Sequence, residues 1–176
     1  FRHGDDLTAA YFSADGTVLT TVGADRVQFW DAATGVRLGG VTPDDDGDDL
    51  ALVVADPAVA LFLTLDGDRK KGRVRRVAVR TGQPLGATPL TGDAQGMARF
   101  SRDGRRLATS HRTLTVFDVA TGRPLWKTQL KTEFAAEPAW SADGTRVVVA
   151  GEKSVVVFDA DTGYRVRTAA VAGRAT

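Results

Sequence analysis

The sequence predicts an all-β protein built from about four four-stranded antiparallel sheets. Two short phrases recur along its 176 residues, and the residues between them form short apolar runs of the length that strands have. No segment shows the i, i+3, i+4 spacing of an amphipathic helix. With 43% hydrophobic and 26% charged residues, the chain has the balance of a domain with a buried core.

The first phrase is an aromatic residue followed by Ser, any residue, Asp and Gly. Glycine after aspartate adopts positive φ without steric cost, and the carboxylate accepts hydrogen bonds from N–H groups of the turn. The phrase therefore predicts a tight turn between the first two strands of a repeat, strands a and b, with turn-forming rather than catalytic aspartates. It occurs at 12–16, 100–104 and 140–144, and its glycines are Gly16, Gly104 and Gly144.

The second phrase ends in Thr-Gly and follows an aromatic-Asp pair in three of its four copies. We expect it to join strands c and d, with Asp31, Asp118 and Asp159 closing the loop. Its glycines lie 47, 40 and 41 residues apart, so two independent phrases give one repeat of about 40 residues. The copies occupy 29–35, 79–82, 117–122 and 158–163.

Each repeat divides into four strands, which in the first repeat are about 7–12, 17–22, 26–30 and 36–41. Strand c is apolar at consecutive positions, as in 155–158, so both faces of its sheet must be buried. Four-stranded sheets that hide both faces against neighbouring sheets are the blades of a β-propeller. Within one segment, 1–176, the blades are expected at about 7–41, 50–90, 97–130 and 137–172.

The second repeat departs from the pattern and is assigned as a blade because the spacing requires one. Residues 55–58 replace the Asp-Gly turn, and the connection between strands b and c is enlarged. We place Arg80 where the other repeats have the aspartate of the aromatic-Asp pair.

These repeats resemble the WD40 family, whose repeat carries a Gly-His near its start, an F-S-x-D-G turn and a closing Trp-Asp. The resemblance covers nearly the whole chain, with Trp30-Asp31 as the closing dipeptide and Phe-Asp as its substitute in the last two repeats. His3 lies nine residues before Phe12, where the histidine of the family falls.

The resemblance also implies a hydrogen-bonded chain that braces the first blade. Its members would be His3, a strand-b threonine (Thr20 or Thr21), Asp25 and Trp30. In later repeats Thr91 and Lys131 stand where histidine belongs, so we expect no such network there.

Four blades are fewer than the seven usual in WD40 rings, so the segment is expected to be part of a larger ring. An open arc of four blades would expose apolar faces on its first and last blades. Further blades, a second copy of the chain or another protein would cover them.

The sequence argues against catalytic, metal and cofactor chemistry. There is no cysteine, and His3 and His111 are the only histidines. Nucleophile-elbow, phosphate-loop and dinucleotide-binding motifs are missing. The acidic run 44–49 suggests calcium, but the EF-hand register puts Thr42 and Val53 at its first and last ligand positions. We expect a solvated loop there, with a calcium or cationic-partner site as the alternative, and predict no enzyme and no cofactor.

Composition bears on the setting of the protein. A net charge of +1 gives no overall field for nucleic acid, and no apolar stretch is long enough to span a bilayer. Isoleucine and asparagine are absent and arginine far outnumbers lysine, a bias of high-GC bacterial genomes. We expect a cytoplasmic bacterial protein.

In WD40 proteins the d–a and b–c loops share the usual binding face, and the resemblance implies the same here. A basic cluster on the longest b–c loop is interpreted as a solvated hairpin tip or, alternatively, a grip for phosphate or an acidic peptide. It has no interleaved aromatic residues, so nucleic acid is not expected. The partner-binding candidates are Asp6, Asp45, Asp46, Asp49, Arg69, Lys70, Lys71 and Arg73.

The predicted function is a protein-interaction scaffold within a multidomain bacterial protein. One alternative is a quinoprotein-like, enzyme-associated propeller, because 117–126 resembles the Asp-x-x-Thr-Gly-x-x-x-Trp phrase of such blades; their cofactor-binding asparagine cannot exist here. The other is a structural half-ring that closes by homodimerisation.

Overall fold

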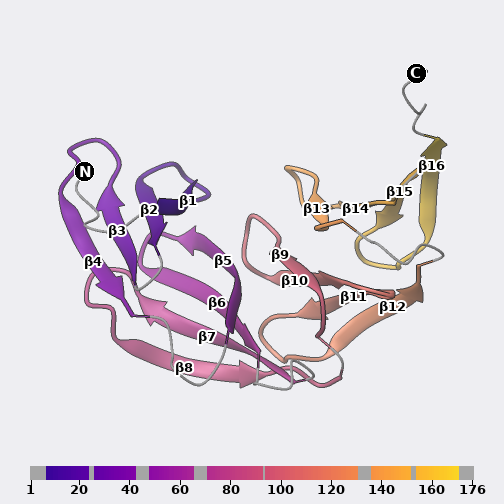
Figure 1. Ribbon diagram of the computed structural model, residues 1–176, viewed down its shortest axis with the longest axis horizontal. Coiled ribbons are helices and arrows are strands. Elements are labelled where there is room, and N and C mark those ends of the chain that lie inside the picture. Colours follow the sequence, from indigo (N-terminus) through magenta and orange to yellow (C-terminus); the bar gives the residue numbers. More distant parts are fainter. Residues whose placement is uncertain are drawn as a thin grey trace.

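The all-β prediction is confirmed by a computed structural model of the chain, which describes residues 7–23, 26–42, 48–65, 71–92, 94–130, 136–151 and 154–170. Sixteen strands of these residues form four antiparallel sheets, each made of four strands consecutive in sequence. Figure 1 shows the four sheets following one another in an arc, the four-bladed propeller arrangement. None of the described segments is a helix that could span a membrane.

The strands of each blade run from a to d in chain order. Blade 1 has β1 (Leu7–Phe12), β2 (Val18–Gly23), β3 (Val27–Asp31) and β4 (Arg37–Val41), and blade 2 has β5 (Asp48–Asp56), β6 (Val59–Leu65), β7 (Gly72–Ala78) and β8 (Pro84–Pro89). Blade 3 has β9 (Met97–Phe100), β10 (Arg106–Ser110), β11 (Thr113–Asp118) and β12 (Pro124–Gln129). Blade 4 has β13 (Ala139–Trp140), β14 (Arg146–Ala150), β15 (Ser154–Asp159) and β16 (Arg165–Ala170).

In blade 1 the a–b turn is closed by its aspartate. The Ser13 hydroxyl donates to Asp15 Oδ1 at 2.6 Å, and the amide of Thr17 donates to the same oxygen at 3.1 Å. Gly16 has φ 77°, which an L side chain adopts only with strain. The turns at Asp103 and Asp143 repeat the serine–aspartate bond. The phrase found in the sequence is thus a hydrogen-bonded unit that positions strand b against strand a.

The c–d loop of blade 2 corrects one sequence alignment. The amide of Gly82 donates to the carbonyl of Ala78 at 2.8 Å, as the amide of Gly122 donates to that of Asp118. Ala78, not Arg80, therefore stands where the other blades have aspartate. The other three copies have the aspartate four residues before the glycine, and the same spacing from Gly82 leads to Ala78.

The hydrophobic core lies between successive blades in three clusters. One joins blades 1 and 2 around Phe29 and Phe62, and the next joins blades 2 and 3 around Leu63 and Phe117. The third joins blades 3 and 4. Strands c of the first and third blades are buried on both faces, as their apolar sequences predicted.

The two ends of the arc differ. Leu114 and Val116 of blade 3 are fully buried against blade 4, but the residues at the same positions of blade 4, Val155 and Val157, are only half-buried. On blade 1, Gln28 and Trp30 are each 5% exposed. The sequence predicts exposed apolar faces on both end blades. For blade 4 this prediction holds in part, and for Gln28 and Trp30 of blade 1 it does not hold.

Candidate functional site

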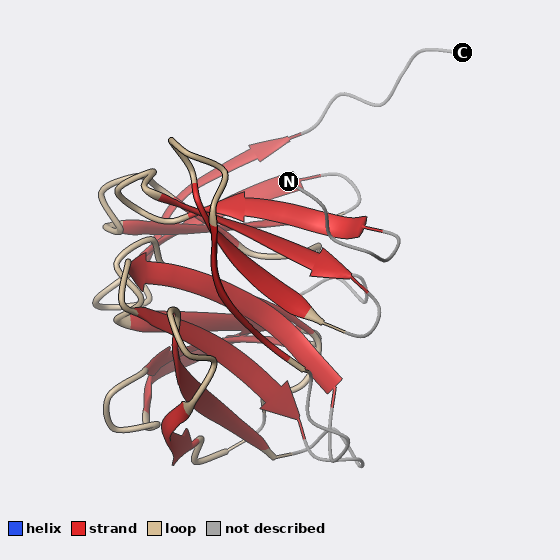
Figure 2. Ribbon diagram, turned by 90° about the vertical axis from the view of Figure 1, so that its left-hand side faces the viewer, coloured by secondary structure: helices blue, strands red, loops and turns tan. Residues whose placement is uncertain are grey.

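The strands place two opposite faces on the arc. In a four-stranded antiparallel blade the a–b and c–d turns lie at one end, the turn face, and the b–c and d–a loops lie at the other, the loop face. Most of the described turns gather at the left-hand ends of the strands in Figure 2. Of the predicted partner-binding residues with described side chains, Lys71 and Arg73 lie at the loop-face end of β7.

Most of the predicted partner-binding residues lie outside the described part of the chain. Outside it lie Asp6, Asp45, Asp46, Arg69 and Lys70, together with His3 and Asp25 of the predicted bracing network. Asp49 belongs to β5, but its side chain is not described. Lys71 is exposed beside the start of β7, and Arg73 is half-buried within it.

The basic cluster of the sequence is divided by the structure. The Arg75 guanidinium lies 5.5 Å from the centre of the Phe62 ring, and its Nε donates to Thr64 Oγ1 at 2.9 Å. Arg76 donates to Thr88 Oγ1 on the neighbouring strand at 2.9 Å. These two cations therefore brace blade 2 rather than project with Lys71 from a hairpin tip.

Blade 1 contains one link of the predicted bracing network. The indole Nε1 of Trp30 donates to Thr21 Oγ1 at 2.8 Å, and both residues are buried. The structure thus chooses Thr21 over Thr20, whose hydroxyl lies on the opposite face of strand b with no protein partner among the described residues.

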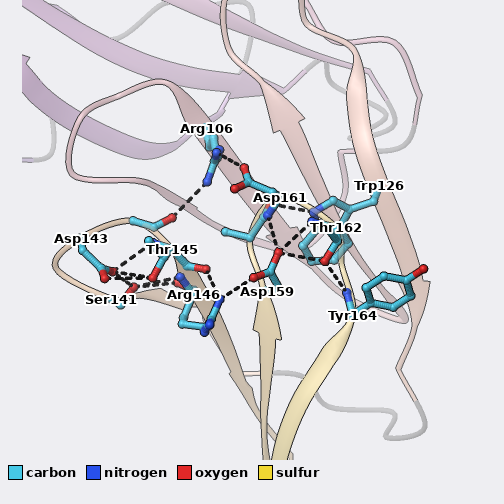
Figure 3. A network of polar contacts seen from close by, with 12 residues as sticks. Arg106, Trp126, Ser141, Asp143, Thr145, Arg146, Asp159, Asp161, Thr162 and Tyr164 are labelled. Carbon is cyan, nitrogen blue, oxygen red and sulfur yellow. Dashed lines mark hydrogen bonds and ion pairs between the residues drawn. The ribbon is translucent and has the colours of Figure 1, made fainter.

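Blades 3 and 4 are joined by polar contacts near the turn face (Figure 3). Trp126 Nε1 donates to the carbonyl of Ala160 at 2.8 Å, and its ring packs on Gly163. Arg106 reaches across to the carbonyl of Gly144 at 3.1 Å and to the Asp161 carboxylate. The Thr-Gly turn of one blade therefore docks on strand d or the adjoining strands of the blade before it.

The same docking recurs at the other junctions. A Cβ added to Gly82 would lie 2.0 Å from the carbonyl oxygen of Gly40 on blade 1. A Cβ added to Gly122 would lie 2.0 Å from that of Pro89 on blade 2. The glycines of the second phrase thus have two tasks, positive φ in the c–d turn and close approach to the preceding blade.

The aspartates of both phrases are stabilised as carboxylates. The Ser141 hydroxyl, followed by the amide and hydroxyl of Thr145, lowers the pKa of Asp143 from 3.8 to about 2. The hydroxyl and amide of Thr162 lower the pKa of Asp159 in the same way. Hydrogen bonds to the charged form cause both shifts, so these groups keep the turns closed at neutral pH.

We predict that acid weakens the fold through these turns. A carboxyl with a lower pKa in the folded state stabilises that state above pH 4 and loses this effect as the pH falls through 2. The urea midpoint should therefore fall between pH 5 and pH 2, and fall less in Asp143→Asn, which keeps an acceptor but does not titrate. A carboxyl NMR titration placing the Asp143 midpoint near 3.8 would contradict the prediction.

A pocket of about 620 Å³ lies on the side of blade 3 that faces blade 2, and it extends from the b–c turn on the loop face to Pro124 beside the c–d turn. Its walls are the d–a loop after β8, the b–c turn of blade 3 and the adjoining parts of β11 and β12. The amide of Thr91 holds the loop to blade 3 by donating to the carbonyl of Gly122 at 2.8 Å. The lining residues used below are Thr109, His111, Arg112, Thr115, Lys127 and Gln129.

One wall of this pocket carries a row of polar side chains across three strands, the polar row. Thr109 of β10 pairs with Thr115 of β11, which pairs in turn with Lys127 of β12. Thr109 is 1% exposed and Thr115 7%. Both hydroxyls border the pocket, and neither forms a hydrogen bond with the described residues.

The same row of blade 4 is mostly apolar. Counted from the Phe-Asp pair, its members are Val149, Val156 and Thr168. The two valines belong to the core between blades 3 and 4. The polar row therefore differs from the row of blade 4, whereas blades 1 and 2 carry the polar residues Gln28 and Arg75 at the position of Thr115. The row was not singled out in the sequence, and comparing strands b and c position by position between repeats is the signal that finds it.

The described rim of the pocket is basic. Its rim carries His111, Arg112 and Lys127, and none of the described lining residues is a carboxylate. Among the described residues no group of three or more His, Cys, Asp or Glu is placed to hold a metal ion. The described hydroxyl and cationic donors favour an anionic ligand.

Comparisons with known proteins place the fold among β-propellers. The structure of the mitotic checkpoint complex contains a chain that matches 96% of this one with a TM-score of 0.67 at 17% identity. BamB from Moraxella catarrhalis matches 96% with a TM-score of 0.63 at 13% identity. This chain covers 52% and 54% of those two chains, about half of their length. The comparison with curated proteins gives no match.

A family profile identifies the relationship at the level of sequence. It is described as outer membrane protein assembly factor BamB and matches residues 70–172. This is a propeller family distinct from WD40, so of the resemblance stated above the propeller is shown and WD40 membership is not. Because the match includes more than half of the 176 residues, the chain belongs to the family of β-propeller proteins described as outer membrane protein assembly factor BamB.

Proposed function

We propose that this chain is a protein-interaction module that binds its partner through the loop face. The observation that carries the proposal is the pocket between blades 2 and 3, which reaches the b–c turn of blade 3 on that face and is lined by side chains from the strands of one sheet. Strands hold such side chains in place before binding, so little entropy is lost when a partner docks.

The comparisons support this proposal in general terms. One similar chain comes from the structure of the mitotic checkpoint complex, and the matched family is described as outer membrane protein assembly factor BamB. A scaffold that displays loops on stacked blades agrees with both descriptions. A bacterial multidomain parent, a cytoplasmic location and binding through the acidic loop residues Asp45, Asp46 and Asp49 remain part of the proposal.

Photo-crosslinking tests which face is used. A photoreactive amino acid is placed in the full-length protein at Lys71 or Arg112 on the loop face, and at Thr17 or Ala142 on the turn face. We expect crosslinks to one partner from the first pair and none from the second in a lysate of the source organism. Equal crosslinking from both faces, or crosslinks from the turn face alone, would reject the proposal.

The half-ring reading remains as a second candidate because one observation favours it. Val155 and Val157 are half-buried at positions that are fully buried in blade 3, so the free face of blade 4 has the residues of a blade contact without the contact. If two copies close a ring there, light scattering should give twice the mass of the chain, and Val157→Glu should return it to monomer. A monomer at every concentration would reject closure by a second copy.

A further inference from the structure

The polar row in the pocket between blades 2 and 3 has no structural task that explains its composition. Thr109 and Thr115 form no side-chain hydrogen bond with the described residues, and their hydroxyl oxygens are not fully buried, so both hydroxyls are open to the pocket. Valine is nearly isosteric with threonine and occupies both equivalent positions of blade 4.

The geometry of the row indicates the size of its ligand. Its three members sit on adjacent strands at paired positions, so from first to last they span two strand spacings, roughly 10 Å. One carboxylate or phosphate contacts only part of that length. The pocket volume of about 620 Å³ also exceeds what one oxyanion fills. The row is suited to a ligand with several acceptors along a chain.

The electrostatics of the pocket indicate the charge of the ligand. Lys127 ends the row, and the b–c turn of blade 3 adds His111 and Arg112 to the rim. Gln129 provides an amide beside them, and the described lining contains no carboxylate. The Arg112 carbonyl accepts from the amide of Leu130 at 2.9 Å, which fixes this turn against the end of strand d. Cations held in place around hydroxyl donors favour acidic groups.

We infer that the pocket between blades 2 and 3 binds an acidic peptide segment, with Thr109, Thr115 and Lys127 donating hydrogen bonds to its carboxylates. The inference rests on the proposed function, since it names the chemistry of the partner at the loop face. It assigns recognition to residues distinct from the acidic and basic loop residues that the sequence suggested.

The test measures peptide binding to the full-length protein by fluorescence anisotropy. The probes are fluorescein-labelled hexaglutamate, hexaglutamine of the same length, and unlabelled inorganic phosphate as a competitor. Thr109→Val, Thr115→Val and Lys127→Thr, combined, convert the polar row to the residues of blade 4. Lys127→Thr alone changes only an exposed side chain, so it remains informative if the triple variant does not fold.

The matched control is Arg105→Thr, which removes one positive charge from the turn face, where the side chain is 86% exposed. We expect hexaglutamate to bind and hexaglutamine not to bind. Affinity should fall about tenfold or more in Lys127→Thr and further in the triple variant, as expected for losing charge-assisted hydrogen bonds. In the control it should change by less than about twofold, as expected for a distant surface charge.

Three results would overturn the inference. Equal losses in Lys127→Thr and Arg105→Thr would show that binding follows net charge rather than the row. Complete competition by phosphate at the concentration of the peptide would assign the site to a free oxyanion. Failure of hexaglutamate to bind while loop-face crosslinks persist would reject the inference and leave the proposed function standing. Binding of hexaglutamate without loop-face crosslinks would reject the proposed docking of a partner on the loop face and leave the binding of acidic peptides by the pocket standing.

Discussion

Gly122→Ala should lower the free energy of unfolding by about 3 kcal/mol or more, whereas Gly144→Ala should lower it by about 1–2 kcal/mol. The two glycines have nearly the same φ, 69° and 70°, so an added methyl group meets the same backbone strain at both. They differ in surroundings, because a Cβ at Gly122 lies 2.0 Å from the carbonyl oxygen of Pro89, and one at Gly144 has nothing within 4 Å.

Urea unfolding of the two variants separates strain from docking. The loss common to both is the cost of positive φ, and the excess at Gly122 measures how rigidly blade 3 is held on blade 2. Similar losses in the two variants would show that the blades shift apart at little cost. That outcome would remove the argument that the pocket between these blades is built before a ligand arrives.

Phe117→Ala should lower the free energy of unfolding by about 3–5 kcal/mol. Phe117 is fully buried, belongs to the core between blades 2 and 3, and forms part of the floor of the pocket. Removing its ring leaves a cavity whose lining strands cannot collapse without disturbing the blade. In a domain of this length the melting temperature should fall by roughly 10 °C.

Phe12→Ala is the matched control, since Phe12 is 67% exposed. Its change should stay within about 0.5 kcal/mol, the range of ordinary surface substitutions. Calorimetry of both variants measures the two changes in stability. A small effect at Phe117 would mean that the second and third blades are held together by their turns and backbone contacts rather than by this core.

The sequence predicts the blades well because turn chemistry is local. An aspartate two residues after a serine and just before a glycine closes a hairpin wherever it occurs, so the phrases locate strands to within a residue or two. The predicted strands 17–22 and 26–30 are β2 (Val18–Gly23) and β3 (Val27–Asp31) in the structure. The same generality explains why the phrases do not separate the WD40 family from the family that the profile matches.

The pocket was missed in the sequence because its polar row is found only by comparing strands b and c between repeats, and its assembly depends on the pairing between strands. Thr109, Thr115 and Lys127 are far enough apart in sequence that only the register of β10, β11 and β12 brings them into one row. Arg80 was aligned with the aspartates of the other c–d loops because the loop of blade 2 has no aspartate to mark that position. Candidates on the acidic loops rested on their composition and on the binding face that the WD40 resemblance implies, and those loops lie mostly outside the described residues.

The docking of each Thr-Gly turn on the preceding blade has a consequence for how such chains grow. One repeat carries both halves of the contact, a glycine turn that docks backward and a strand d that receives the next turn. An in-frame duplication of about 40 codons would therefore bring a complete junction with it. Lengthening by whole blades needs no compensating change in the older repeats, which is how unequal recombination could produce rings of different sizes from one ancestral unit.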